Sequence, residues 1–218
     1  MIKACIFDLD GTLLDTITTI THYVNYALES QNLPPVTEEE CKYFAGNGAT
    51  LLIERALASK GVSDSAVFER TFAVYNAAYN AAPLHLTTVF DGVEQLISDL
   101  KSRGIKLAVL SNKPHVAVFD IVKSFFGDSF DAVFGGREGV PLKPAPDAVF
   151  AVLSELGVLP EETAYVGDTG VDMLTGKAFG ARKTVGVLWG FRPAKELWEG
   201  GADAVVSTVE ELLSEVLK

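Results

Sequence analysis

Short runs of apolar residues recur along the chain, and each run ends in small or polar residues. The runs lie at residues 2–7, 106–112, 131–136, 164–168, 183–189 and 202–206. Continuous apolar runs of this length are typical of strands that are buried on both faces of a sheet. Amphipathic segments separate them, at residues 91–104, 116–127, 146–157, 171–180 and 208–218. The alternation predicts βαβ units and a doubly wound, Rossmann-like parallel sheet of the α/β class.

Residues 16–85 interrupt this alternation and contain only helical patterns. Helices are expected at residues 17–31, 37–44, 49–61 and 65–80. Thr37 followed by Glu40 has the spacing of a capping box at the start of the second of these helices. The sequence therefore predicts an α/β core from residues 1–15 and 86–218, with a helical domain inserted at residues 16–85.

Composition and charge narrow the class of protein. Of the 218 residues, 48% are hydrophobic, which is typical of a globular protein. The 29 acidic and 18 basic residues give a net charge of −11, which argues against nucleic acid as a partner. No apolar run reaches the roughly 18 residues of a membrane-spanning helix, so no membrane association is expected. With only Cys5 and Cys41, no disulfide framework is indicated, which favours the cytoplasm.

Polar side chains follow several of the predicted strands. They are Asp8, Asp10, Ser111, Asn112, Lys143, Asp168 and Asp172. Because the carboxyl ends of parallel strands meet at one edge of a sheet, we expect these side chains to share one crevice. Asp8 and Asp10 would repel each other unless a cation or a proton lies between them. Carboxylate oxygens are ligands that Mg²⁺ prefers, so the pattern predicts a magnesium site.

This group of residues indicates phosphoryl chemistry. A carboxylate beside Mg²⁺ can attack a phosphate ester and form an aspartyl-phosphate. Lys143 would supply further positive charge, and backbone N–H groups after Asp8 could bind phosphate oxygens. Asp10 lies in the turn begun by Gly11, from which it could protonate the leaving group and later activate a water. A small phosphorylated metabolite is the expected substrate.

Four motifs in order resemble those of the haloacid dehalogenase superfamily. They are residues 8–12 (DLDGT), 111–113 (SNK), 143–144 (KP) and 167–172 (GDTGVD). The resemblance spans the whole core, and the helical insertion lies where that family carries a small helical cap. True dehalogenases lack the second aspartate of the first motif, so Asp10 favours phosphate chemistry.

The resemblance implies a role for each motif residue. Asp8 would be the nucleophile and Asp10 the acid and base. The Asp8 side chain, the Asp10 carbonyl and Asp168 would hold Mg²⁺. Thr12, Ser111, Asn112 and Lys143 would bind the substrate, the last three at its phosphoryl group. Asp172 would orient Lys143 or a water bound to the metal.

Two further segments, residues 46–49 (GNGA) and 187–192 (VLWGFR), resemble the phosphoglycolate phosphatase group of this superfamily. They imply that the enzyme is a Mg²⁺-dependent phosphatase with 2-phosphoglycolate as its best candidate substrate. Asn47 and Gly48 would then contact the far end of the substrate through backbone N–H groups. The same loop is equally interpreted as the end of one helix and the start of the next. Arg192 could reach an anion or lie only at the surface, and the surface is the expectation.

Three alternatives remain open from the residues. The enzyme could hydrolyse another small phosphate or pyrophosphate, or it could be a sugar phosphomutase similar to β-phosphoglucomutase. The mutases carry a histidine at the position of Ile20, and its absence from this chain disfavours the mutase interpretation. A signalling receiver domain also phosphorylates an aspartate beside Mg²⁺. The helical insertion and the Asp10-Gly11-Thr12 sequence disfavour a receiver.

Overall fold

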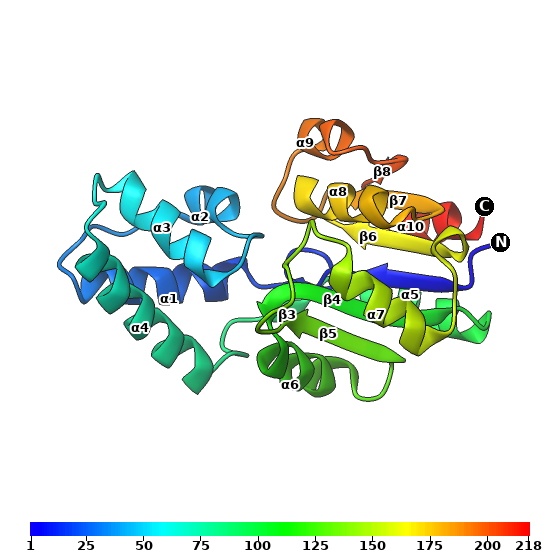
Figure 1. Ribbon diagram of the computed structural model, residues 1–218, viewed down its shortest axis with the longest axis horizontal. Helices are drawn as coiled ribbons and strands as arrows, with labels where there is room; N and C mark the ends of the chain where they lie inside the picture. Colours follow the sequence, from blue (N-terminus) through cyan, green and yellow to red (C-terminus); the bar gives the residue numbers. More distant parts are fainter. The chain divides into compact units, whose positions relative to one another are not determined.

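The computed structural model describes residues 1–218 and divides into two compact units, which Figure 1 draws as ribbons. One unit contains Met1–Asp15 and Val89–Lys218, and the other contains Thr16–Thr88. The helical unit extends three residues beyond the expected limit at residue 85. It does so because the Thr87 hydroxyl lies 2.9 Å from the hydroxyl of Thr19. None of the helices combines the length and the apolar character that a membrane span requires.

The first unit is built on a six-stranded parallel sheet in the order β5-β4-β1-β6-β7-β8. The strands are β1 (Ala4–Phe7), β4 (Lys106–Pro114), β5 (Ala132–Gly136), β6 (Thr163–Gly167), β7 (Lys183–Val187) and β8 (Ala204–Val206). The chain builds the sheet outward from β1 to one edge and then to the other. The predicted doubly wound α/β class is thereby confirmed, and the strand order reverses at β1.

Helices cover both faces of this sheet (Figure 1). Successive side chains of a strand point to opposite faces, so Cys5 and Phe7 join one apolar cluster while Ala4 and Ile6 join the other. The first cluster includes side chains of α5 (Val93–Ser102), α6 (His115–Phe126) and α10 (Val209–Leu217). The second includes side chains of α7 (Asp147–Leu156) and α8 (Gly170–Phe179).

Four short elements of the structure are absent from the sequence prediction. They are β2 (Leu14–Asp15), β3 (Thr88–Val89), the 3-10 helix η1 (Pro160–Glu162) and α9 (Ala194–Glu199). Strands β2 and β3 pair with each other in a separate two-stranded sheet. None of these four elements carries a continuous apolar run or several helical turns, which explains why the pattern does not reveal them.

The second unit contains four helices. They are α1 (Ile17–Glu29), α2 (Glu38–Phe44), α3 (Ala49–Ser59) and α4 (Ser65–Ala81). The predicted capping box of α2 is confirmed, since the Glu40 N–H donates to Thr37 Oγ1 at 3.2 Å and the Thr37 N–H donates to Glu40 Oε2 at 2.7 Å. Val24 and Ile53 are fully buried in this unit, as expected for the apolar faces of packed helices.

The register of the sheet brings three strand ends to one level. Phe7 of β1 pairs with Val109 of β4 and with Val166 of β6. Asp8 follows Phe7 directly, while Ser111 and Asp168 each lie two residues beyond the paired valines. In doubly wound sheets, ligands bind beyond the carboxyl ends of the strands where the strand order reverses, which in this sheet is at β1.

Candidate functional site

Asp8 lies at the end of β1, and its side chain is almost completely buried, with the residue 6% exposed. Its Oδ1 accepts a hydrogen bond from the Leu9 N–H at 2.7 Å and lies 2.9 Å from Lys143 Nζ. Burial raises the pKa of Asp8 to about 7; the Asp172 carboxylate adds to this rise, and the Lys143 ammonium opposes it. The surroundings of this carboxyl group therefore favour its protonated form more than water does.

Lys143 is the buried cation of the site. Its Nζ lies 2.7 Å from Asp172 Oδ1 as well as 2.9 Å from Asp8 Oδ1. Burial by itself lowers the pKa of Lys143, but the carboxylates of Asp172 and Asp8 outweigh it and raise the pKa well above its usual value. The side chain consequently remains a positively charged ammonium.

The amide of Asn112 holds the loop that carries Lys143. Its Oδ1 accepts the Lys143 N–H at 2.8 Å, and its Nδ2 donates to the Lys143 carbonyl at 3.2 Å. Asn112 is itself buried at the end of β4. In this structure its amide therefore fixes the position of Lys143.

Asp168 follows β6 and is completely buried. Thr12 Oγ1 donates to its Oδ1 at 3.0 Å, and the Phe191 N–H donates to its Oδ2 at 2.8 Å. Burial, followed by the charges of Asp172 and Asp8, raises the pKa of Asp168 well above its usual value despite these hydrogen bonds. Gly11 packs against this carboxylate with φ +80°, and a Cβ there would lie 2.3 Å from Asp168 Oδ2.

Asp172 lies in the first turn of α8 and joins the acidic group. Its Oδ2 accepts hydrogen bonds from the Thr169 hydroxyl at 2.6 Å and from the Thr169 N–H at 3.1 Å. The Asp172 N–H donates in return to Thr169 Oγ1 at 3.4 Å, which completes a capping box. Carboxylate oxygens of Asp8, Asp168 and Asp172 all lie within 4.8 Å of one another. Three buried acids with one ammonium among them leave an excess of negative charge, which a divalent cation with oxygen ligands would neutralise.

The Asp10 carboxylate is not one of the three acids in that group. Its Oδ1 pairs with Lys113 Nζ at 2.8 Å. The side chains that gather at the site are therefore those of Asp8, Asp168 and Asp172. The metal role that the family resemblance implies for Asp10 belongs to its backbone carbonyl rather than to this carboxylate.

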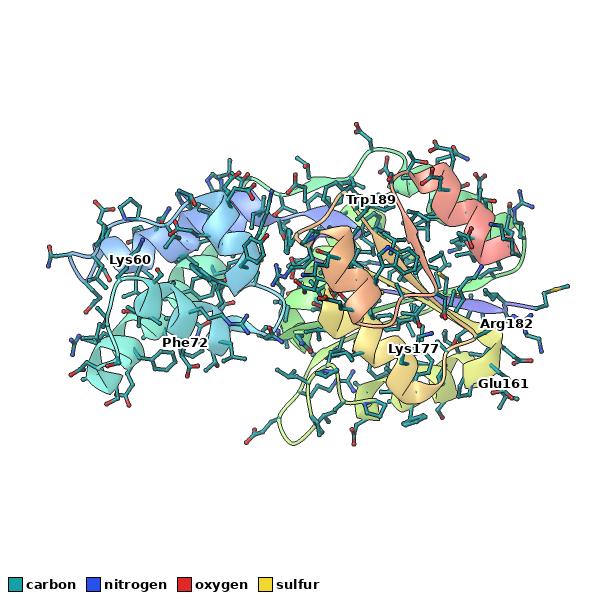
Figure 2. The ribbon with its side chains drawn as sticks, turned by 90° about the horizontal axis from the view of Figure 1, so that it is seen from above. Lys60, Phe72, Glu161, Lys177, Arg182 and Trp189 are labelled. Carbon is teal, nitrogen blue, oxygen red and sulfur yellow. The ribbon has the colours of Figure 1, made fainter.

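Ser111 and Thr12 are both buried. Ser111 Oγ accepts the Lys113 N–H at 3.3 Å. The Thr12 hydroxyl is bound to Asp168, and the Trp189 indole N–H donates to the Thr12 carbonyl at 3.0 Å. Trp189, labelled in Figure 2, comes from the loop after β7, so that loop supports the turn after β1.

Two predicted residues belong to the helical unit. Asn47 and Gly48 lie in the loop between α2 and α3, and Gly48 precedes the first residue of α3 with φ +88°.

The expectation that Arg192 is at the surface is wrong. Arg192 is 8% exposed, and its Nε lies 3.2 Å from Glu196 Oε2, so the first turn of α9 covers it.

Three further residues of the site received no role in the sequence analysis. Lys113 is the third residue of the SNK motif, so its place in that motif could have indicated a role for it. Thr169 has the spacing of a capping residue before Asp172. Tyr165 is completely buried in β6 close to Lys143, and nothing in the sequence signals this.

Comparison with known proteins adds independent evidence. The family model of haloacid dehalogenase-like hydrolases matches residues 5–187. Phosphoglycolate phosphatase 1 of Pseudomonas aeruginosa is 33% identical over 216 residues, covering 97% of this chain and 78% of the relative. A phosphoglycolate phosphatase of Cereibacter sphaeroides is 35% identical over 217 residues, covering 97% and 98%. A crystal structure from Lactobacillus delbrueckii subsp. bulgaricus, assigned as a phosphoglycolate phosphatase, has a TM-score of 0.93 at 34% identity and covers 98% of each chain.

Proposed function

Because this chain belongs to the haloacid dehalogenase-like hydrolases and is a phosphoric monoester hydrolase, we propose that it hydrolyses 2-phosphoglycolate in a Mg²⁺-dependent reaction. The observation that carries the reaction type is the buried Asp8 carboxylate, held 2.9 Å from Lys143 within a group of three acids. The names of the relatives support the choice of substrate. Glycolate and inorganic phosphate would be the products.

The acidic group fits a divalent cation, which phosphatases of this family generally use. Burial, and after it the charge of Asp172, raises the pKa values of Asp8 and Asp168, and added positive charge would favour their ionised forms. The side chains of Asp8 and Asp168, with the carbonyl of Asp10, would hold Mg²⁺. When bound, the ion supplies positive charge that offsets the negative charge of the phosphoryl group.

Asp8 would act as the nucleophile. An oxygen of its carboxylate forms a bond to phosphorus while the bond between phosphorus and the ester oxygen breaks, so that the phosphoryl group moves to Asp8. Lys143 would counter the charge of the phosphoryl oxygens, and the Ser111 hydroxyl would bind one of them. Asn112 would act through the Lys143 loop that it holds. Thr12 would act through Asp168.

Asp10 would move the protons of both steps. In the first step its protonated carboxyl group gives a proton to the ester oxygen as glycolate leaves. In the second step the resulting carboxylate takes a proton from water while the water oxygen attacks the aspartyl-phosphate. The bond between phosphorus and Asp8 then breaks, which releases phosphate and restores the Asp8 carboxylate.

The helical unit would act as the cap that selects the substrate. Its loop at Asn47 and Gly48 carries backbone N–H groups at the start of α3, a position suited to an anion such as the glycolate carboxylate.

We also assign the enzyme to the cytoplasm, since its two cysteines are buried free thiols. The net charge of −11 supports a small metabolite rather than nucleic acid as its partner.

A phosphate-release assay tests this proposal. The panel would contain 2-phosphoglycolate, pyrophosphate, phosphoserine, sugar monophosphates and nucleotides, each with Mg²⁺ and then with EDTA. We expect metal-dependent release with a clear preference for 2-phosphoglycolate, and no release by Asp8→Asn. Release without that preference would reject the substrate and retain the chemistry. No release from any ester, with conversion of a sugar bisphosphate instead, would identify a phosphomutase.

A further inference from the structure

Lys113 is a charged residue of the site that the proposed reaction leaves without a role. Its ammonium forms an ion pair with Asp10, with 2.8 Å between Nζ and Oδ1. The side chains are only 10% and 18% exposed, respectively. This pairing differs from an ordinary surface salt bridge, because both partners are largely withdrawn from water and one is the proposed acid and base.

An irregularity in β4 brings Lys113 to this position. The pairing of β4 with β5 shifts register between Leu110 and Pro114. Within that interval the Lys113 N–H turns back to Ser111 Oγ at 3.3 Å. Such irregularities redirect side chains next to active sites. Here, residues from the same three-residue stretch serve the proposed phosphoryl site through Ser111 and reach Asp10 through Lys113.

Asp10 differs from the other acids of the site in how it is held. Asp8, Asp168 and Asp172 each have at least two donor groups on their carboxyl oxygens. The Asp10 carboxylate has Lys113 as its single hydrogen-bond partner. Without that partner, its side chain would be free to change rotamer, and a proton donor displaced by about 1 Å can lose about 10²-fold in rate.

We propose that Lys113 is the positioning residue of the acid and base Asp10. The inference rests on the proposed function, since it concerns the proton that Asp10 gives to the ester oxygen and later takes from water. Lys113 neither gains nor loses a proton in these steps. It holds the carboxyl group in place, and its positive charge stabilises the carboxylate that remains after the proton has gone to the leaving group.

A double-mutant cycle tests this coupling. The variants are Asp10→Asn, Lys113→Ala and the combination of both, and the readout is kcat for 2-phosphoglycolate at saturating Mg²⁺. General acid catalysis contributes about 10²–10⁴-fold, so we expect Lys113→Ala to lower kcat about 10-fold to 100-fold. If Lys113 acts through Asp10, adding Lys113→Ala to Asp10→Asn changes kcat by less than about twofold.

The leaving group provides a second readout that a purely structural role would not affect. Phenyl phosphate needs a proton on its departing oxygen more than para-nitrophenyl phosphate does, and neither carries a carboxylate. We expect Lys113→Ala to lose much more activity on phenyl phosphate than on the nitro ester, as Asp10→Asn does. Lys113→Arg, which retains a donor and the charge, should recover most of the loss.

Matched controls separate this role from simpler ones. Lys123→Ala removes an exposed lysine that pairs with Asp128. It should change neither the activity on the two aryl esters nor kcat for 2-phosphoglycolate. Equal melting temperatures of Lys113→Ala and the wild type would exclude unfolding as the cause of lost activity. Should Lys113 instead bind the substrate carboxylate, Lys113→Ala would raise KM for 2-phosphoglycolate and leave the aryl esters unaffected.

Failure of the role proposed for Lys113 can be distinguished from failure of the proposed function. Suppose that the wild-type enzyme releases phosphate. The role of Lys113 would then be overturned if the kcat losses of the two single variants multiplied in the double variant, or if Lys113→Ala lost equal activity on both aryl esters. A wild-type protein that released no phosphate from any ester would overturn the proposed function itself, and the assignment of Lys113 with it.

Discussion

The carboxyl group of Asp8 lies among charges that act on it in opposite directions. Burial and the Asp172 carboxylate favour its protonated form, whereas the Lys143 ammonium favours the ionised form. A nucleophile must be ionised, so the balance among these groups determines how much Asp8 is active. An added cation beside Asp8 and Asp168 would shift that balance toward the carboxylate.

Asp8→Asn tests the nucleophile at the residue scale. The amide has nearly the same shape and can still accept the Leu9 N–H through its oxygen, so we expect the fold to persist. Turnover should fall below detection, because an amide is a poor nucleophile toward phosphorus. Phosphate release and circular dichroism would check this. Asp128→Asn, which alters an exposed acid, is the matched control, and near wild-type activity of Asp8→Asn would remove Asp8 from the mechanism.

Gly11→Ala tests the turn that follows β1. The new Cβ would lie 2.3 Å from Asp168 Oδ2 at a residue with φ +80°, so it would displace the carboxylate as well as strain the backbone. Gly104→Ala is the control, because its φ is +74° and nothing lies within 4 Å of the new Cβ. Backbone strain alone costs about 1–2 kcal/mol.

Urea denaturation and phosphate release would measure both glycine variants. We expect Gly104→Ala to lose about 1–2 kcal/mol in free energy of unfolding and to retain its turnover. Gly11→Ala should lose more stability and most of its turnover. Equal effects of the two substitutions would show that the contact with Asp168 does not matter.

At the element scale, the start of α8 serves two purposes. The Thr169 capping box stabilises the helix, and the same Asp172 carboxylate that closes the box also binds Lys143 at 2.7 Å. Helix α2 starts with a capping box of the same type, formed by Thr37 and Glu40, which is exposed. The two helices therefore offer a comparison between a structural cap and a cap that is part of the site.

Thr169→Ala and Thr37→Ala should both lower the free energy of unfolding by about 1 kcal/mol, since each removes a capping hydroxyl. Only Thr169→Ala should also lower kcat, because the Asp172 carboxylate loses a 2.6 Å hydrogen bond and holds Lys143 less firmly. Thermal unfolding and steady-state kinetics would compare them. Unchanged kcat in Thr169→Ala would show that Asp172 is held sufficiently by its remaining contacts.

At the scale of the whole molecule, the acidic group links stability to pH. In the metal-free protein the pKa of Asp8 is about 7, against the usual 3.8 expected in the unfolded chain. Between these values the native state binds more protons than the unfolded state, so stability falls as pH rises through this window. The raised pKa of Asp168 acts in the same direction.

Mg²⁺ should therefore stabilise the protein more at pH 7.5 than at pH 5.5, because binding requires ionised carboxylates. The Asp8 contribution is at most about 4 kcal/mol, since one pKa unit corresponds to about 1.4 kcal/mol. Melting temperatures with Mg²⁺ and with EDTA at several pH values would measure the gain. Asp8→Asn should make the gain in melting temperature from Mg²⁺ less dependent on pH. A gain that did not change with pH would contradict the link between Mg²⁺ binding and ionisation of the carboxylates.

The order of helices and strands follows from local patterns in the sequence. Apolar runs of strand length predicted all six strands of the large sheet, because both faces of these strands are buried. The capping box at Thr37 and Glu40 was likewise predicted, since its partners lie three residues apart. Both signals depend on residues that are close in the chain. Helix α9 and the short strands β2 and β3 are too brief to carry such a signal.

The candidate residues at strand ends were also accessible from the sequence, whereas their partners were not. Parallel strands bring Asp8, Lys143 and Asp168 together by topology alone. Which carboxylates meet depends on side-chain direction, so the tertiary structure was needed to place Asp10 beside Lys113 and to select Lys143 from the two partners expected of Asp172. It likewise buried Arg192 under the first turn of α9. The contacts of Asp172 and Asp10 join residues far apart in the chain, and packing rather than local periodicity decides their geometry.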